Sequence, residues 1–461
     1  MSAAPALEPV FEHIAANADR YVERLLSYLR HPSISAQNIG IREVADLLVA
    51  ELDALGMQAE AVESAGHPFV LGRMVTDPAR PTVLLYGHYD VQPPDPLEAW
   101  ISPPFEPTLR DGRIWARGAG DNKGQHFAQI LAIEAVLAVH GALPCNVVVL
   151  LEGEEEVGSP HIAEFVRTHA DRLDVDLVVT ADGPQHPSGH PIVTFGVRGM
   201  VSFELRARTA GRDAHSGNFG GVMPNAIWTL VHLLGTMKTP DGTITIEGLH
   251  DPVIPPTEAE RAAVRALPLD VAAVLQETGM TQLDQPLDRG FYDRLMFHPT
   301  LTINGLHGGY GGPGSKTVLP AEAVAKCDIR LVEAMTPDQA LDAVTAHVAK
   351  HAPEVEVVPM GGMLPSKTPL DSPFADPVVA AVARGMGRAP LIYPVVGGSL
   401  PDYVFTKDLG VPALVTPYAN ADEANHAPNE NIELRLFLNG IRTGAALLWE
   451  LGQMSGPPAR S

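Results

Sequence analysis

The chain begins with two stretches in which apolar residues recur every three or four positions. These stretches, residues 7–30 and 41–56, are therefore predicted to form amphipathic helices. Gly56 ends the second pattern, and glycine commonly ends a helix because it adopts the left-handed conformation at little cost. We expect the chain to open with two helices.

Short apolar runs then alternate with further helical patterns. Such runs are typical of strands that are buried on both faces of a sheet. They lie at residues 82–86, 146–151 and 176–180, with helical patterns near 124–139 and 160–169. The same texture returns near residue 376 and continues to the amphipathic C-terminal segment. This order predicts an α/β fold with a mostly parallel sheet flanked by helices.

The pattern changes between residues 196 and 365. A strand with period-two alternation is followed by a helix, a long Pro-rich stretch, a second strand and a second helix, which suggests a small separate α/β unit. Residues 251–300 carry no pattern that indicates a role. We predict a larger domain made of residues 1–195 and 366–461, with a smaller α/β domain inserted at 196–365.

Length and composition indicate a folded protein with two or three domain-sized units. The 461 residues are 45% hydrophobic and 19% charged, which is ordinary globular usage. The 55 acidic and 32 basic residues give a net charge of -23, which repels phosphate backbones and anionic lipids. Neither nucleic acid nor a membrane is an expected partner.

Cysteine usage and the N-terminal segment indicate the cellular compartment in which the protein is expected. Cys145 and Cys327 are too few for a disulfide framework or a Cys-rich zinc site. The first 20 residues lack the apolar core of a signal peptide, and the aliphatic run at 147–151 is too short to span a membrane. We expect the protein in the cytoplasm.

Potential metal ligands follow four strand-like runs, the three given above and a fourth at residues 412–418. In open parallel sheets the ligand crevice lies at the carboxyl ends of the strands, so these groups are expected to meet. They are His88 and Asp90, Glu154 to Glu156, Asp182, and His426. A glycine-rich loop at 116–124 adds Asp121 to the same edge of the sheet.

The spacing within these segments favours a metal site over solvated surface acids. His88 and Asp90 lie on one face of an extended segment, and a metal-bound imidazole commonly donates its other N–H to a carboxylate. Acids directly after a buried strand are costly unless a cation or a proton compensates them. The mixed nitrogen and oxygen ligands suit zinc, manganese or cobalt better than calcium or copper.

The sequence contains more candidate ligands than one metal ion binds. Two metals that share a bridging carboxylate use them economically, and paired ions activate water and polarise a carbonyl. One remaining glutamate would then be free to act as a general base.

Three other motifs do not fit the functions they suggest. Residues 309–314 match G-x-G-x-x-G, but no phosphate-binding helix pattern follows them. Ser315 separates Gly314 from Lys316, which breaks the P-loop pattern, and Ser399 does not lie in a G-x-S-x-G turn. Dinucleotide binding and serine hydrolysis are therefore not favoured.

Taken together, the motifs resemble the M20 family of metallopeptidases. They occur in the family's order along nearly the whole chain: GHYDVQP (87–93), ARGAGDNKGQ (116–125), EGEEEVGS (152–159), ADG (181–183), AHSG (214–217) and the His426 loop. Within the family, HSGNFGG (215–221), GSKTVLP (314–320), DIRLV (328–332) and GGSLP (397–401) are most similar to the cytosolic dipeptidase and carnosinase branch.

This resemblance implies a zinc-exopeptidase-like catalytic domain with an inserted lid or dimerisation domain, and a role for each matching residue. Asp121 would bridge two divalent ions, zinc being the first choice and manganese or cobalt the alternatives. His88 and Asp182 would complete one site, Glu156 and His426 the other. Glu155 would be the general base, and Asp90 would orient His88.

The resemblance also implies roles for residues of the insert. His215 would stabilise the oxyanion in the active site of a partner subunit, so a homodimer is expected. Arg330, Thr317 and Ser399 would hold the carboxylate and backbone of the substrate. The chain departs from the branch at 360–370, where no histidine matches a further substrate contact, and this leaves the side-chain specificity open.

We therefore predict a metallopeptidase with two metal ions that cleaves dipeptides or short peptides bearing a free C-terminal carboxylate. One alternative on the same scaffold is removal of an N-acyl or N-carbamoyl group from an amino acid. Another is a non-catalytic metal-binding protein, which the presence of Glu155 beside a ligand disfavours.

Overall fold

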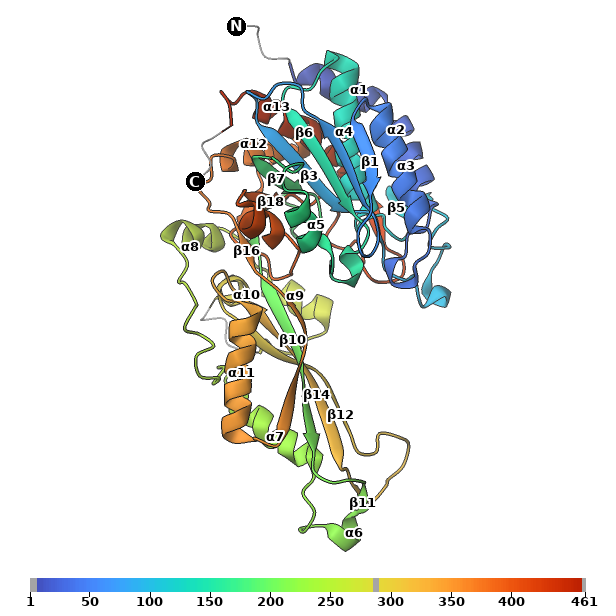
Figure 1. Cartoon of the computed structure of the whole chain (residues 1–461). Helices are drawn as coiled ribbons and strands as arrows, with labels where there is room; N and C mark the ends of the chain where they lie inside the picture. The colour runs from blue at the N-terminus through green and yellow to red at the C-terminus, as the bar shows by residue number, and fades with distance from the viewer. Residues whose placement is uncertain (1–5, 285–289, 458–461) are drawn as a thin grey trace. The chain divides into compact units, whose positions relative to one another are not determined.

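The computed structural model describes residues 6–284 and 290–457, which form two compact units (Figure 1). The first unit takes its residues from 1–196, 367–394 and 404–461. The second takes its residues from 197–366 and adds a short return segment, 395–403. The chain therefore leaves the first unit twice, once for a long excursion and once for a short one.

An eight-stranded sheet forms the centre of the first unit. Its strands follow the order β1-β2-β6-β3-β7-β18-β8-β17, and the four central strands from β6 to β18 run parallel. Strands β1 and β2 join antiparallel at one edge. Their bounds are β1 (Gln58–Val62), β2 (Phe69–Met74), β3 (Thr82–His88), β6 (Asn146–Glu152), β7 (Leu177–Thr180), β8 (Ile192–Thr194), β17 (Leu391–Tyr393) and β18 (Ala413–Val415). The predicted α/β fold is confirmed.

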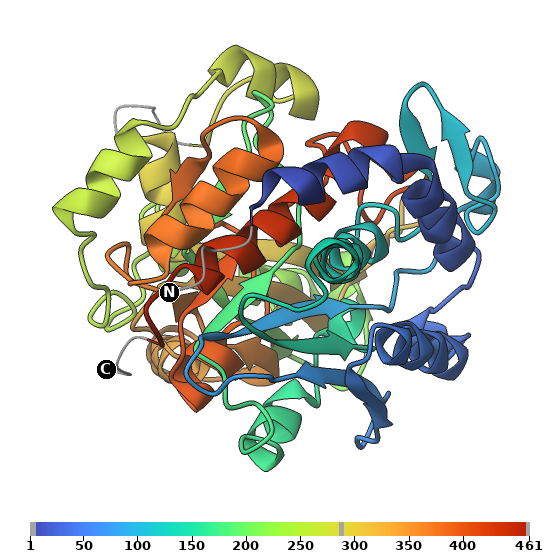
Figure 2. The same cartoon turned by 90° about the horizontal axis from the view of Figure 1, so that it is seen from above.

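Helices from both ends of the chain cover one face of this sheet. Side chains at alternate positions of β3, Val83 and Leu85, enter the large hydrophobic core beneath these helices. Helices α1 and α13 both pack against α4 and against each other, so the first and the last helix lie side by side (Figure 2). The helices are α1 (Glu8–Ala16), α2 (Ala18–Leu29), α3 (Ile41–Ala54), α4 (Lys123–His140), α12 (Ala375–Met386) and α13 (Leu434–Gly452).

The opposite face of the sheet is covered by α5 (Ile162–Thr168) and the π-helical turn η5 (Val404–Leu409). The ring of Tyr86, on β3, meets the edge of Phe405 with centroids 5.2 Å apart. Phe69 of β2 stacks on Phe165 of α5 at 4.0 Å. The central strands are thus buried on both faces, which explains their continuous apolar runs.

The N-terminal region contains one helix more than the hydrophobic pattern predicts. Residues 7–30 divide into α1 and α2 at Asn17, whose side-chain amide donates to the backbone carbonyl of His13 at 2.8 Å. Asparagine breaks a helix in this way because its side chain competes for backbone hydrogen bonds. The expected end of α3 is confirmed, since Gly56 is left-handed (φ 81°) and its N–H donates to the carbonyl of Asp53.

The second unit contains a four-stranded antiparallel sheet in the order β12-β14-β10-β15. One face carries α7 (Ala226–Met237) and α11 (Pro337–His351), and its core includes Val201, Phe203 and Leu205 from alternate positions of β10. The strands are β10 (Gly199–Arg208), β12 (Thr300–Gly308), β14 (Glu322–Leu331) and β15 (Val355–Met363).

Strands β12 and β15 were not predicted from the sequence. Both carry glycines and several exposed residues, so neither shows a continuous alternation of apolar and polar side chains. Within the segment 251–300, whose role the sequence does not indicate, the described residues form three helices: α8 (Glu258–Arg265), α9 (Val271–Thr278) and α10 (Phe291–Phe297).

The structure also contains shorter elements. They are η1 (Ser35–Gln37), η2 (Leu97–Ala99), β4 (Thr108–Arg110), β5 (Arg113–Trp115), η3 (Glu155–Val157), β9 (Gly196–Val197), β11 (Ala214–His215), α6 (Ser216–Phe219), β13 (Val318–Leu319), β16 (Ser366–Lys367) and β19 (Asn431–Glu433). Among the described helices, none combines the length and the apolar character that crossing a bilayer requires.

Candidate metal centre

Metal-ligand candidates gather at the carboxyl ends of the parallel strands in the first unit. His88 is the last residue of β3, and Asp182 lies two residues beyond β7. Glu156 lies in η3, the turn after β6, and Asp121 lies two residues before the start of α4. His426 lies in the loop between β18 and β19, where its backbone is left-handed (φ 58°).

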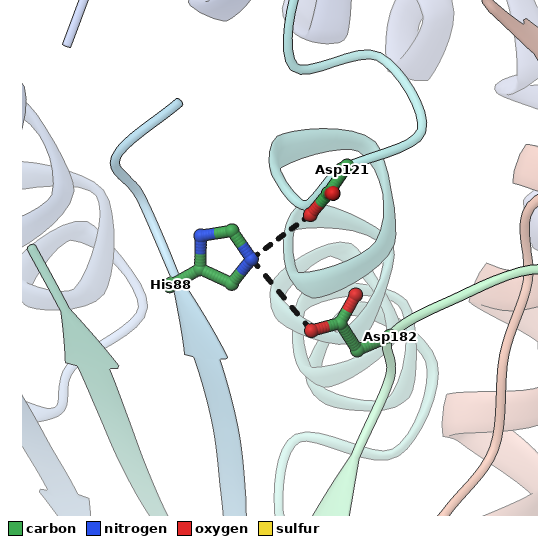
Figure 3. Close-up of side chains that lie close together, drawn as sticks. All are labelled: His88, Asp121 and Asp182. Carbon is green, nitrogen blue, oxygen red and sulfur yellow. Dashed lines mark hydrogen bonds and ion pairs between the residues drawn. The ribbon is translucent and has the colours of Figure 1, made fainter. Parts of the chain in front are cut away.

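The first ligand group consists of His88, Asp121 and Asp182 (Figure 3). The Nε2 atom of His88 lies 3.0 Å from Oδ1 of Asp121 and 3.6 Å from Oδ2 of Asp182. The His88 side chain is buried, and the two carboxylates approach the same ring nitrogen from different elements. Three donor atoms thus converge within reach of one ion.

The second group shares Asp121 with the first. Its other oxygen, Oδ2, lies 3.1 Å from Nε2 of His426, and the same nitrogen lies 3.2 Å from Oε2 of Glu156. In each group the donor atoms lie within 4.8 Å of one another. Each oxygen of Asp121 therefore faces a different ligand group.

The protonation of these groups in the protein without metal shows how strongly the negative charges are concentrated. Although burial acts to lower it, the pKa of His88 is raised well above its usual value by Asp121, Asp182 and Asp90. Hydrogen bonds to Asp121 and Glu156 raise the pKa of His426 to about 10. In this state the imidazoles bind protons where divalent cations would bind, so the donor set fits such ions.

Glu155 directly precedes the ligand candidate Glu156 in the sequence and is partly buried. Burial raises its pKa well above the usual value; His88 opposes this effect, whereas the carboxylates of Asp182 and Asp121 add to it. A carboxylate with a raised pKa beside a metal site suits a group that accepts and returns a proton.

Asp90 has more contacts than the sequence indicates. Its Oδ1 lies 3.3 Å from Nδ1 of His88, which leaves Nε2 of the ring for a metal. Its two oxygens also accept the backbone N–H groups of Glu155 (3.2 Å) and Glu156 (3.1 Å). One buried carboxylate therefore fixes both a ligand and the turn that carries the expected base.

The sequence analysis did not identify two residues that contact the ligand-bearing segments. Asn122 donates its side-chain amide to the carbonyl of Ala181 at 2.6 Å, and its Oδ1 lies 3.4 Å from the N–H of His88. Gln92 donates to Oε2 of Glu156 at 2.9 Å. Both belong to the quoted motifs, but only the fold shows which ligand-bearing segments they connect.

The expected substrate contacts belong to the second unit and form two pairs. Nδ1 of His215 accepts the backbone N–H of Gly217, so Nε2 carries the proton and donates to Thr317 Oγ1 at 3.3 Å. Arg330 donates from NH1 to Ser399 Oγ at 2.7 Å. Its Nε lies 3.9 Å from Asp328 Oδ2, at the outer limit of an ion pair.

A family model matches residues 84–450, which span every ligand named above, and its description is peptidase family M20/M25/M40. The chain belongs to this family. The predicted metallopeptidase is therefore confirmed at the level of the family. The match also covers the residues of the second unit that interrupt the larger one.

Relatives with a similar sequence support the narrower prediction of the dipeptidase and carnosinase branch. A human Beta-Ala-His dipeptidase is 29% identical, covering 97% of this chain and 93% of its own length. A Cys-Gly metallodipeptidase, DUG1 of Candida albicans, is 31% identical, covering 97% of this chain and 98% of its own.

Solved structures agree with these relationships. The M20 family metallo-carboxypeptidase Sso-CP2 from Sulfolobus solfataricus has a TM-score of 0.89 and 31% identity, covering 94% of this chain and 99% of its own. Human carnosine dipeptidase 1 has a TM-score of 0.83 and 29% identity, covering 98% of this chain and all of its own.

Proposed function

We propose that this protein is a dipeptidase that uses two divalent metal ions to hydrolyse the amide bond of dipeptides or short peptides with a free C-terminal carboxylate. The observation that carries the proposal is the pair of ligand groups sharing Asp121, with Glu155 beside them. The names of the similar dipeptidases from human and Candida albicans support the substrate class.

The metal ligands would act as two sets. His88, Asp121 and Asp182 would hold one ion, and Asp121, Glu156 and His426 the other. When bound, the ions would activate a water molecule and polarise the scissile carbonyl. Zinc is the first choice for these nitrogen and oxygen donors, with manganese or cobalt as alternatives.

Glu155 would move the proton. As a carboxylate it would take a proton from the attacking water, and as a carboxylic acid it would return that proton to the leaving amine. Its raised pKa supports this cycle, because a more basic carboxylate accepts the proton more readily. Asp90 would hold the Glu155 backbone in place during both transfers.

His215 would stabilise the developing oxyanion. Its Nε2–H is the donor that this role needs, and the Nδ1 bond to Gly217 keeps that tautomer. We assign the inserted unit as a lid and dimerisation domain that supplies His215 to the site of a partner subunit. A homodimer is therefore part of the proposal.

Arg330 would bind the substrate carboxylate. It faces away from the core, because its neighbours Ile329 and Leu331 are buried on the other face of β14. Ser399 holds one end of its guanidinium, which orients the planar group for a two-point contact. Thr317, beside His215, would contact the substrate backbone.

A substrate panel tests the proposed function. The enzyme purified without metal is reloaded with zinc, manganese or cobalt and assayed on dipeptides, N-acyl amino acids and N-carbamoyl amino acids. We expect kcat/KM to be highest on free-acid dipeptides and to vanish when the ions are chelated. Preference for the N-substituted amino acids would instead support the alternative function, an amidohydrolase that removes N-acyl or N-carbamoyl groups. Absence of turnover on every amide would support a non-catalytic metal-binding protein. The cytoplasmic location stays a prediction.

A further inference from the structure

A second buried carboxylate, Glu430, holds the loop that carries Asp121. Its Oε1 accepts the backbone N–H groups of Gly120 and Asp121, each at 2.9 Å. Its Oε2 accepts the N–H of Gly118 at 3.0 Å and NH1 of Arg117 at 2.7 Å. Glu430 is fully buried, and these four donors belong to five consecutive residues of the loop.

We propose that Glu430 is a positioning residue that fixes the bridging carboxylate of Asp121 for metal binding, an inference that rests on the proposed two-metal site. Three backbone N–H groups that converge on one carboxylate define the path of the loop from Gly118 to Asp121. Because Asp121 belongs to both ligand groups, a shift of this loop would disturb both metal sites together.

Glu430 also connects the two loops that carry ligands. It lies four residues after His426, and its own carbonyl accepts the N–H of Ala116 at 3.1 Å. Directly beyond it, β19 pairs with β5, where Asn431 lies opposite Trp115. The His426 loop and the Asp121 loop are therefore connected by the side chain of Glu430, by its backbone carbonyl and by the pairing of β19 with β5. In this proposal the side chain of Glu430 sets the distance between the two loops.

A rival explanation is that Glu430 contributes only negative charge near the cations. Glu423 provides a matched control for charge, because it is also buried, lies in the same loop and packs against Gly120. A Cβ atom added to Gly120 would lie only 2.2 Å from its Oε2. Yet neither side-chain oxygen of Glu423 has a hydrogen-bond partner among the described residues. It places a carboxyl group beside the loop without holding the loop's backbone.

The test compares metal binding by the full chain and its Glu430→Gln and Glu423→Gln variants. Zn²⁺ affinity is measured by competition with a chromogenic chelator, and the absorption bands of Co²⁺ report the ligand geometry. We expect Glu430→Gln to weaken Zn²⁺ binding about 10–100-fold at both sites and to change the Co²⁺ bands, as is usual when a partner of a metal ligand is lost. Glu423→Gln should match the unmodified protein.

Equal weakening in both variants would assign the effect to charge and overturn the proposal, and so would unchanged binding in Glu430→Gln. If Glu430→Gln does not fold, Glu430→Asp decides in the same way, because it keeps the charge but is too short to reach all four donors. These measurements need no substrate. An unmodified protein that binds fewer than two ions would refute the proposed two-metal site itself.

Discussion

The carboxylate of Asp90 accepts the backbone N–H of Glu155 at 3.2 Å. The same oxygen lies 3.3 Å from Nδ1 of His88, so one buried side chain connects the expected base with a metal ligand. Small displacements of catalytic groups are costly because proton transfer requires hydrogen-bond distance. Asp90 thereby couples the metal site to the proton-transfer step.

Replacement of Asp90 should therefore affect metal binding and turnover together. In Asp90→Asn the side chain keeps its size but loses the charge that stabilises the His88 ring. We expect metal affinity to fall about 10–100-fold and kcat to fall even at saturating metal. Chelator competition and steady-state kinetics measure the two effects. Normal kcat with weakened metal binding would show that the charge of Asp90 acts on metal binding alone and is not coupled to turnover.

The assignment of Arg330 predicts discrimination against substrates without a free carboxylate. C-terminal amidation of a dipeptide should cost about 2–4 kcal/mol of transition-state stabilisation, as for breaking a charged hydrogen-bonded pair. Arg330→Ala should be slow on both forms and discriminate little between them, and Arg330→Lys should not restore the loss because an ammonium lacks the planar fork. Equal kcat/KM for free-acid and amidated dipeptides would remove this role.

If His215 acts in the site of a partner subunit, two inactive variants should complement each other. Mixing His215→Ala with Glu155→Gln protomers creates hybrid dimers in which one of the two sites holds both intact groups. Random exchange should recover about a quarter of the unmodified activity. The readout is activity after exchange has been verified by mass spectrometry of tagged subunits. No recovery would place His215 in its own subunit's site or outside catalysis.

The buried carboxyl group of Glu152 should make the stability of the metal-free protein depend on pH. Burial raises its pKa from the ordinary 4.5 to about 8, although Tyr86 donates to its Oε2. The folded state then keeps a proton that the unfolded state loses, so stability falls as pH rises from 4.5 to 8.

Glu152→Gln should abolish this contribution. We expect it to stabilise the metal-free protein by roughly 2–4 kcal/mol at pH 8 and to have little effect near pH 4.5, as measured by urea unfolding. Glu98→Gln, at an exposed position, is the control and should not change the slope. A similar stability difference at both pH values would show that packing rather than ionisation is responsible.

The central sheet could be predicted because its strands are buried on both faces. The apolar runs that contain Val83 and Val148 leave little choice of secondary structure, and acids and histidines at strand ends indicate the edge where a site forms. The outer strands of the inserted unit could not be predicted, because exposed positions such as Ile303 and Met360 obscure the alternation.

The residues that support the metal ligands could be identified only from the fold. His88 and Asp121 belong to recognisable motifs, but the contacts of Glu430 with the Asp121 loop span more than 300 positions of the sequence. No local pattern distinguishes Glu430 from a solvated acid. Its role depends on the pairing of β19 with β5, which only the tertiary structure shows.

Metal content and turnover of Glu155→Gln, measured on the same preparation, test the account most directly. The substitution removes proton transfer but leaves the ligands of both groups in place, whereas Asp121→Ala removes the ligand that they share. We predict that Glu155→Gln binds two metal ions like the unmodified enzyme and loses about 10²–10⁴-fold in kcat on dipeptides. Asp121→Ala should lose metal as well. A Glu155→Gln enzyme with both ions and near-normal turnover would contradict the account.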